Sequence, residues 1–241
     1  MKTFYHHGQC GDIIYSLPTV KALGGGTLSL GMNETLLNAM IPLLYTQSYI
    51  EYVDWSKDSG LPKGYINLDD FRIQAADTKL HLVNCHLRAF GLPDYDFSKP
   101  WLEGIKITTE PYAVINVTDR YIDKAFNWRK EVKYLQSKYE DVYFLGLEKE
   151  YKNFIDKYKI SLTFVPTDDF LVAAKIIGNA MMYTGNQSSL MAIRQGLGLP
   201  YRIHKSPYMP NCCQYNEKET IINPISRKIH ILGAAIKEVL R

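Results

Sequence analysis

The chain has 241 residues, of which 46% are hydrophobic and 22% are charged, and its formal net charge is +3. This composition is ordinary for a globular protein, and the chain is long enough for one large domain or two small ones. Its mildly basic charge suits anionic small molecules but lacks the strong bias of a dedicated nucleic-acid binder. No apolar run approaches the roughly 18 residues of a membrane helix, no signal-peptide pattern is visible and the four cysteines form no disulfide framework, so we expect a cytoplasmic protein without a membrane span.

In the first half of the chain, short apolar runs alternate with amphipathic stretches, a pattern typical of βαβ units and a mainly parallel sheet. Asn33 stands where it would cap a helix, and Pro18 lies inside another helical stretch, where it allows a kink or a late helix start. We expect strands at residues 2–5, 27–31, 50–53 and 65–68, and helices at residues 12–23, 34–45 and 78–90.

Residues 94–109 lack periodicity, which indicates a linker before a second βα series. Residues 208–220 resemble a loop, and an amphipathic helix is expected from Ser226 to Leu240. The strands of this series are expected at residues 112–117, 141–146, 161–165, 180–185 and 199–204, and the helices at residues 128–139, 148–158, 168–177 and 188–197.

These elements predict an α/β protein of two Rossmann-like domains, each with a parallel sheet. The first domain is expected to span residues 1–104 and the second residues 105–225. A closing helix at residues 226–241 is expected to pack back on the first domain.

The segment HHGQCGDIIYSLP joins the first strand to the first helix. Gly8 and Gly11 would let the backbone approach a ligand closely, and the N–H groups at a helix start favour anions. Asp12 has two interpretations: it caps the helix, or it is a general base that faces a cleft between the domains. His7, beside the glycines, could contact substrate or simply be exposed at a strand end.

The segment NVTDRYIDKAFNWR follows the first strand of the second series. Loops at the carboxyl ends of parallel strands are where open α/β sheets bind ligands. Thr118, Arg120, Lys124 and Arg129 place hydroxyl and cationic donors there, which suits a phosphate. The alternative is a solvated loop with ordinary surface charge.

The segment MMYTGNQSSL ends a strand and opens a helix. Ser188 and Ser189 are natural helix caps, and the same helix start would receive a diphosphate well. The residues of this turn that we take as candidates for ligand binding are Gly185, Asn186, Gln187, Ser188 and Ser189. No P-loop lysine and no G-x-G-x-x-G pattern accompanies them.

Metal-binding patterns are poor. His81 and Cys85 are four residues apart on an expected helix without an evident third ligand, and His204, Cys212 and Cys213 lack zinc-site spacing. We therefore expect no bound metal and no cofactor.

Three segments in order resemble the heptosyltransferase-like glycosyltransferases, the ADP-heptose transferase family. The first is GDIIYSLPTVKAL, the second is VINVTDRYIDKAFNWRKEVKYLQSKYEDVYFLGLEKE, and the third is DDFLVAAKIIGNAMMYTGNQSSLMAIRQGLGLP. The resemblance covers about residues 4–200 and implies the GT-B fold, in which the parallel sheets of two Rossmann-like domains face a cleft.

The resemblance also implies an enzyme, a metal-independent, inverting transferase that moves a sugar from a nucleotide-sugar to an acceptor hydroxyl. The family's catalytic aspartate falls on Asp12 and its phosphate loop on Thr118 and Lys124. Its nucleotide-binding turn, usually Asp-Ser-Gly, falls on Gln187, Ser188 and Ser189, so the acidic residue is missing; a family histidine falls near Ala192 and is missing as well.

Two alternatives stay open, the first favoured by these departures and the second permitted by the mildly basic charge. One is a catalytically silent protein of the same fold that binds a nucleotide or a carbohydrate. The other is a viral-type transferase that acts on a hydroxymethylated DNA base. The acceptor, whether a glycan, a lipid-linked glycan or a modified base, is not named by the sequence, and neither is the oligomeric state.

Overall fold

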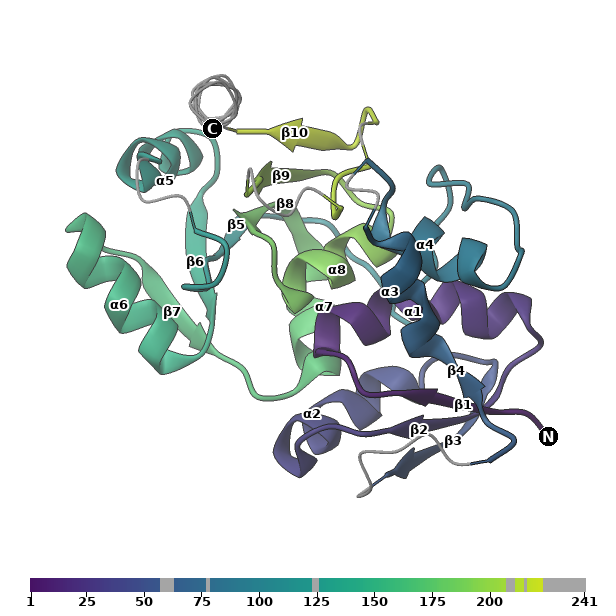
Figure 1. Cartoon of the computed structure of the whole chain (residues 1–241). Coiled ribbons are helices and arrows are strands. Elements are labelled where there is room, and N and C mark those ends of the chain that lie inside the picture. Colours follow the sequence, from purple (N-terminus) through teal and green to yellow (C-terminus); the bar gives the residue numbers. More distant parts are fainter. Residues whose placement is uncertain (57–62, 77–78, 123–125, 207–210, 215, 223–241) are drawn as a thin grey trace, which may run out of the picture.

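The computed structural model describes residues 1–56, 63–76, 79–122, 126–206, 211–214 and 216–222, which form two parallel β-sheets with helices around them (Figure 1). The first sheet has the order β3-β2-β1-β4, and all of its strand pairs are parallel. Its strands are β1 (Thr3–His6), β2 (Gly26–Leu30), β3 (Ile50–Trp55) and β4 (Ile66–Asn67). The helices of this half are α1 (Cys10–Ala22), α2 (Glu34–Leu44), the 3₁₀ turn η1 (Leu68–Asp70), α3 (Phe71–Gln74) and α4 (Leu82–Ala89).

The second sheet has the order β10-β9-β8-β5-β6-β7 and is also parallel throughout. Its strands are β5 (Glu110–Asn116), β6 (Asp141–Gly146), β7 (Thr163–Pro166), β8 (Ala180–Asn186), β9 (Tyr201–His204) and β10 (Glu219–Ile221). The helices are α5 (Trp128–Gln136), α6 (Glu148–Tyr158), α7 (Phe170–Asn179) and α8 (Ser189–Gly196). The central strands read as continuous apolar runs because parallel sheets are covered on both faces.

One hydrophobic cluster contains buried residues from both halves of the chain, and a second cluster lies between the second sheet and helices α5 and α6. Helix α1 packs against α8 and α2 packs against α7, so helices of both halves lie between the sheets (Figure 1). The backbone N–H groups of Trp101 and Leu102 both donate to Gly196 O, at 2.8 and 2.9 Å. Residues 94–109 thus return across α8 without forming a helix or a strand before the second sheet begins. No helix among the described residues is long and apolar enough to span a membrane.

Most expected elements are present, but several bounds were wrong. Helix α1 begins at Cys10, earlier than expected, and runs through Pro18 to Ala22. Helix α4 begins only at Leu82, because His81 caps it: its Nδ1 accepts the Val83 N–H at 3.2 Å.

Two further features of the fold were not expected. Helix α3 and the turn η1 were missed, and β10 forms within the stretch expected to be a loop because residues 219–221 pair with β9. The expected helix from Ser226 to Leu240 lies outside the described residues.

Candidate functional site

Both sheets have a point at which the strand order reverses. In the second sheet the chain moves from β5 outward to β6 and β7, then returns to the other side of β5 for β8, β9 and β10. In the first sheet the reversal lies between β1 and β4. Ligands of open parallel sheets bind at such reversals, beyond the carboxyl ends of the strands. The loops that follow β1, β4, β5 and β8 are therefore the candidate ligand-binding segments.

A cavity of about 800 Å³ lies at these strand ends. Its lining comes from both halves of the chain: residues within 9–15, 35–39 and 71–82 on one side, and residues within 116–121, 146–150, 167–173, 187–190 and 211–212 on the other. Gly11 lies against Ser189, since a Cβ built on Gly11 would be 3.7 Å from Ser189 Cα. The starts of α1 and α8 therefore meet in the cavity.

Asp12 lines the cavity, but it is not the helix cap that one interpretation expected. Gln9 is the N-cap of α1, and Asp12 is the third helical residue. The Asp12 carboxylate accepts the backbone N–H of Gln9 at 3.1 Å, an arrangement known as a capping box. The carboxylate remains partly exposed at the cavity, so the bond to Gln9 does not exclude a role as a base.

His7 and Gly8 do not line this cavity. His7 Nδ1 lies 2.5 Å from Asp69 Oδ2, and the His7 side chain is 53% exposed. Gly8 is buried beside His6, where a Cβ would lie 2.5 Å from the imidazole Cε1. The glycine is therefore required by the packing of His6, not by a ligand in the cavity.

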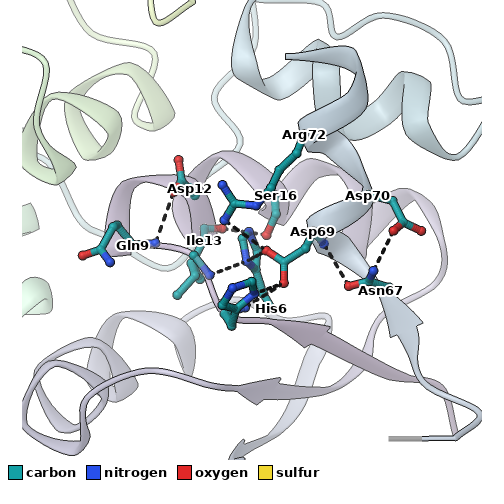
Figure 2. A network of polar contacts seen from close by, with 11 residues as sticks. His6, Gln9, Asp12, Ile13, Ser16, Asn67, Asp69, Asp70 and Arg72 are labelled. Atoms are coloured by element: carbon teal, nitrogen blue, oxygen red, sulfur yellow. Dashed lines mark hydrogen bonds and ion pairs between the residues drawn. The ribbon is translucent and has the colours of Figure 1, made fainter. Parts of the chain in front are cut away.

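Asp69 lies at the centre of a polar network at the reversal of the first sheet (Figure 2). Its carboxylate accepts the backbone N–H of His7 at 3.1 Å and is contacted by His7 Nδ1, by His6 Nδ1 at 3.1 Å and by Arg72 at 3.4 Å. Burial raises the pKa of Asp69, but the contacts with His6 and His7 outweigh burial and hold the pKa well below its usual range. The Asp69 carboxylate therefore links η1, the turn that follows β4, to the loop after β1.

The loop after β5 supplies Thr118 and Arg120 to the cavity lining. The Arg120 guanidinium lies over the Tyr121 ring, 4.7 Å from its centroid, and Tyr121 has a left-handed backbone with φ of 62°. A left-handed tyrosine is uncommon, and such strained residues cluster at binding and catalytic sites. Lys124, expected in the same loop, lies outside the described residues, and Arg129 instead donates to Tyr158 O and Lys159 O at the C-terminal end of α6.

Some residues of the turn after β8 line the cavity, and others hold neighbouring segments in place. Gln187, Ser188 and Ser189 line the cavity, and Ser188 caps α8 by accepting the Met191 N–H at 3.2 Å. The Gln187 amide oxygen accepts the Ser206 N–H at 2.8 Å, so this oxygen already has a hydrogen-bond partner within the protein.

Asn186 and Gly185 do not line the cavity. The buried Asn186 side chain accepts the Thr118 N–H at 3.0 Å and donates to Thr118 O and Arg120 O, both at 2.8 Å. Gly185 lies within the sheet, where a Cβ would be 2.3 Å from Asn116 O. Both residues were expected to bind substrate, but they hold the loop after β5 and the strand beside it.

Several lining residues were missed by the sequence analysis. Glu150 and Asp168 follow β6 and β7, and the rule on strand ends could have found them. Burial raises the pKa of Glu150, whose carboxylate accepts the Leu147 N–H at 3.2 Å. Phe71 and Arg72 line the cavity from α3 and had no sequence signal, because α3 has only 4 residues.

One wall of the site carries the Asp12 carboxylate and Arg72, and the other carries Arg120, hydroxyl and backbone N–H donors together with the carboxylates of Glu150, Asp168 and Asp169. Such donors suit an anionic group such as a diphosphate, and the Asp12 carboxylate can accept a proton from a hydroxyl. Among the residues that the structure describes, no group of three or more His, Cys, Asp or Glu side chains could hold a metal ion.

No protein-family model and no curated protein matches the chain. Solved structures do match it. The glycosyl transferase family 9 structure from Veillonella parvula is 11% identical with a TM-score of 0.67, over 98% of this chain and 88% of that chain. The E. coli heptosyltransferase WaaC with ADP is 12% identical with a TM-score of 0.65, over 100% of this chain and 99% of that chain. The iron-containing heptosyltransferase TibC is 12% identical with a TM-score of 0.59, over 92% of this chain and 62% of that chain. At these identities the likeness shows a shared α/β fold with parallel sheets.

Proposed function

We propose that the protein is a glycosyltransferase that moves a sugar from a nucleotide-sugar to an acceptor hydroxyl. The observation that carries the proposal is that Asp12 and the start of α8 line one cavity at the carboxyl ends of parallel strands. The shared fold supports it, because one of the similar structures is a heptosyltransferase that holds ADP. The proposal includes a GT-B arrangement, in which residues 1–104 and 105–225 are two domains that face each other across the cavity.

The donor diphosphate is proposed to lie against the second half of the chain. Arg120 supplies a cation, Thr118 a hydroxyl, and the start of α8 its free backbone N–H groups and the positive end of its dipole. Lys124 belongs to the same proposed set by sequence. Asn186 keeps this loop in place without touching the donor, since its side-chain amide is occupied by Thr118 and Arg120.

Asp12 is the proposed general base. It accepts the proton of the acceptor hydroxyl as the oxygen attacks the anomeric carbon, and the bond from that carbon to the diphosphate breaks. The electron pair leaves with the diphosphate, whose charge is stabilised by Arg120 and by backbone N–H groups without a metal. Attack from the face opposite the leaving group inverts the anomeric centre.

A second candidate is a binding protein of the same fold without transferase activity. It is favoured by Gln187, which replaces the acidic residue of the resembled motif and whose amide oxygen is already bonded to Ser206. Such a protein would bind a nucleotide or nucleotide-sugar at the same donors without consuming it.

A thermal-shift screen against nucleotide-sugars and free nucleotides tests both candidates, because a ligand that binds only the native state raises its stability. The best ligand is then incubated with the protein, and release of the nucleoside diphosphate is followed. Stabilisation with release supports the transferase, and stabilisation without release supports the binding protein. If no nucleotide or nucleotide-sugar stabilises the protein, both proposals are wrong.

A further inference from the structure

The first half of the chain places one cation in the cavity lining that the structure describes, Arg72 of α3. Its side chain reaches toward the start of α1, which carries Asp12 (Figure 2), and is 52% exposed. The guanidinium lies over the Phe71 ring, 5.1 Å from the ring centroid, a contact that limits its orientations. Arg72 is therefore held at the cavity on the same wall as the proposed base.

The N–H groups of Arg72 are largely available to a ligand. A guanidinium has five donors, and among the described residues those of Arg72 contact Asp69, with Nη2 3.4 Å from Oδ1. This is a long hydrogen bond, and Asp69 is bound more closely by His6 and His7. Asp69 therefore depends little on Arg72, and most of the guanidinium donors have no acceptor within the described part of the chain.

Three carboxylates of the cavity lining are already bonded to backbone N–H groups. Asp12 accepts the Gln9 N–H at 3.1 Å, and Glu150 accepts the Leu147 N–H at 3.2 Å. Asp169 caps α7 through its side-chain oxygen. Their charges are therefore balanced in part by backbone dipoles, which lets an anion approach Arg72. The remaining repulsion favours a singly charged carboxylate over a doubly charged phosphate at this position.

Most of the remaining first-half wall is apolar. What we call the apolar strip is formed by Leu36 and Ala39 of α2, Ala75 and Ala76 after α3, and Leu82 at the start of α4. Leu36 and Ala39 are three residues apart, so they share one face of α2, and Leu36 is 40% exposed. A polyhydroxylated sugar would leave hydroxyls without partners against this strip, whereas burial of an apolar body there is favourable.

We propose that the acceptor is a hydroxylated carboxylic acid with an apolar body, and that Arg72 is the residue that selects it. The carboxylate pairs with the planar guanidinium of Arg72, whose fork of N–H groups matches two carboxylate oxygens. The apolar body lies against the apolar strip, and the hydroxyl donates to Asp12. This inference rests on the proposed function, because it names the acceptor of the same site.

The probe is para-hydroxyphenylacetate, titrated into the protein with the best nucleotide present to fill the other wall, and the NMR signal of the Arg72 Nε–H group reports binding. Its neutral amide lacks the charge, glucuronate carries the charge on a polyhydroxylated body, and para-methoxyphenylacetate has no hydroxyl proton to donate. Each of the three should bind roughly 10-fold more weakly than the probe. A fourth acid, ω-hydroxydecanoate, shows whether an aliphatic body is preferred to an aromatic one.

Two variants with matched controls assign the binding to these side chains. Arg72→Gln should weaken binding of the acid by roughly 10- to 100-fold and leave nucleotide affinity unchanged. Arg88→Gln is its control, because Arg88 bonds to Asp94 at 2.7 and 2.6 Å and does not line the cavity. Leu36→Asn should weaken binding roughly 10-fold. Val172→Asn, at a 46% exposed position of α7 outside the lining, should not.

The inference is overturned if none of the acids binds, if the amide binds as tightly as the acid, or if glucuronate binds more tightly than both apolar acids. It is also overturned if Arg72→Gln loses nucleotide affinity and keeps its affinity for the acid, since Arg72 would then belong to the donor site. The proposed function fails separately, when no nucleotide or nucleotide-sugar stabilises the protein. The titration without nucleotide then still decides whether Arg72 and the apolar strip bind the acid.

Discussion

Asp12 is the third residue of α1, and its carboxylate already accepts the Gln9 N–H at the helix start. Asparagine at this position keeps an oxygen that can accept the same N–H, but it cannot take up a proton. A helix-start role and a catalytic role therefore predict different consequences for a single substitution.

Asp12→Asn should reduce the rate of sugar transfer, or of slow donor hydrolysis, by roughly 10²- to 10⁴-fold, the usual contribution of general base catalysis. The melting temperature and the affinity for nucleotide should stay close to wild type, because the bond to Gln9 is kept and the donor lies on the other wall. Rates are measured by release of the nucleoside diphosphate. A rate equal to wild type would remove Asp12 from the mechanism and favour the binding protein.

Arg120→Ala should weaken nucleotide binding by about 1–3 kcal/mol, the usual cost of losing a charge-assisted hydrogen bond. Arg120 lines the cavity and is held over Tyr121. The matched control is Arg129→Ala, from the same sequence segment: Arg129 donates to the carbonyls of Tyr158 and Lys159 at the C-terminal end of α6, so its loss should affect stability but not binding. The affinities of both variants for the best nucleotide are measured by calorimetry. If the two variants bind it equally well, the assignment of Arg120 to the nucleotide site is wrong.

At the scale of elements, the helix starts are capped by side chains with different sensitivity to pH. Asn33 caps α2 and Asp169 caps α7 through side-chain oxygens. His81 caps α4 through Nδ1, and it is buried against Tyr15 and Phe97. Burial lowers the pKa of His81 to about 3 from its ordinary 6.5.

A histidine whose pKa is lower in the folded state takes up its proton more readily when unfolded. His81 therefore reduces stability progressively as pH falls below 6.5 towards its folded pKa, by up to about 1.4 kcal/mol per pH unit. His81→Asn keeps a residue that caps helices well, but asparagine does not take up a proton in this pH range. Urea unfolding at pH 7 and pH 5 should show that the wild type loses about 2 kcal/mol more than the variant over this interval. An equal loss in both proteins would contradict this account.

At the scale of the whole molecule, the hydrophobic cluster that contains residues of both halves predicts that the halves unfold together. Trp101 and Leu102 pack on α8 at Gly196, where a Cβ would lie 2.7 Å from Leu102 Cγ. Gly196→Ala should therefore destabilise the protein by about 1–3 kcal/mol, the usual cost of overpacking, while the unfolding remains a single transition.

Differential scanning calorimetry checks this expectation, with Gly178→Ala as the control. Gly178 lies on α7, and a Cβ there would find its nearest atoms at 3.4 Å, an ordinary contact, so this variant should not be destabilised by crowding. Two separate transitions in the wild type would show that the halves unfold independently despite the shared hydrophobic cluster.

The order and type of most elements were predictable from the sequence because they depend on local signals. Apolar periodicity predicted both βα series, Asn33 and Ser188 were recognisable as helix caps, and helix α6 has the bounds that were expected. Asp12, Thr118 and Arg120 could be selected because loops at the ends of parallel strands bind ligands.

Only the tertiary structure decided which of these candidates reach the cavity. Asn186 and Gly185 have the sequence context of ligand-binding residues, yet they contact Thr118 and Asn116, which lie about 70 residues earlier in the chain. Arg72 lines the cavity from the short helix α3, and Asp69 meets His6 and His7 across 63 and 62 residues. Local patterns contain no information about such long-range contacts, because these form only when strands distant in sequence pair in a particular order.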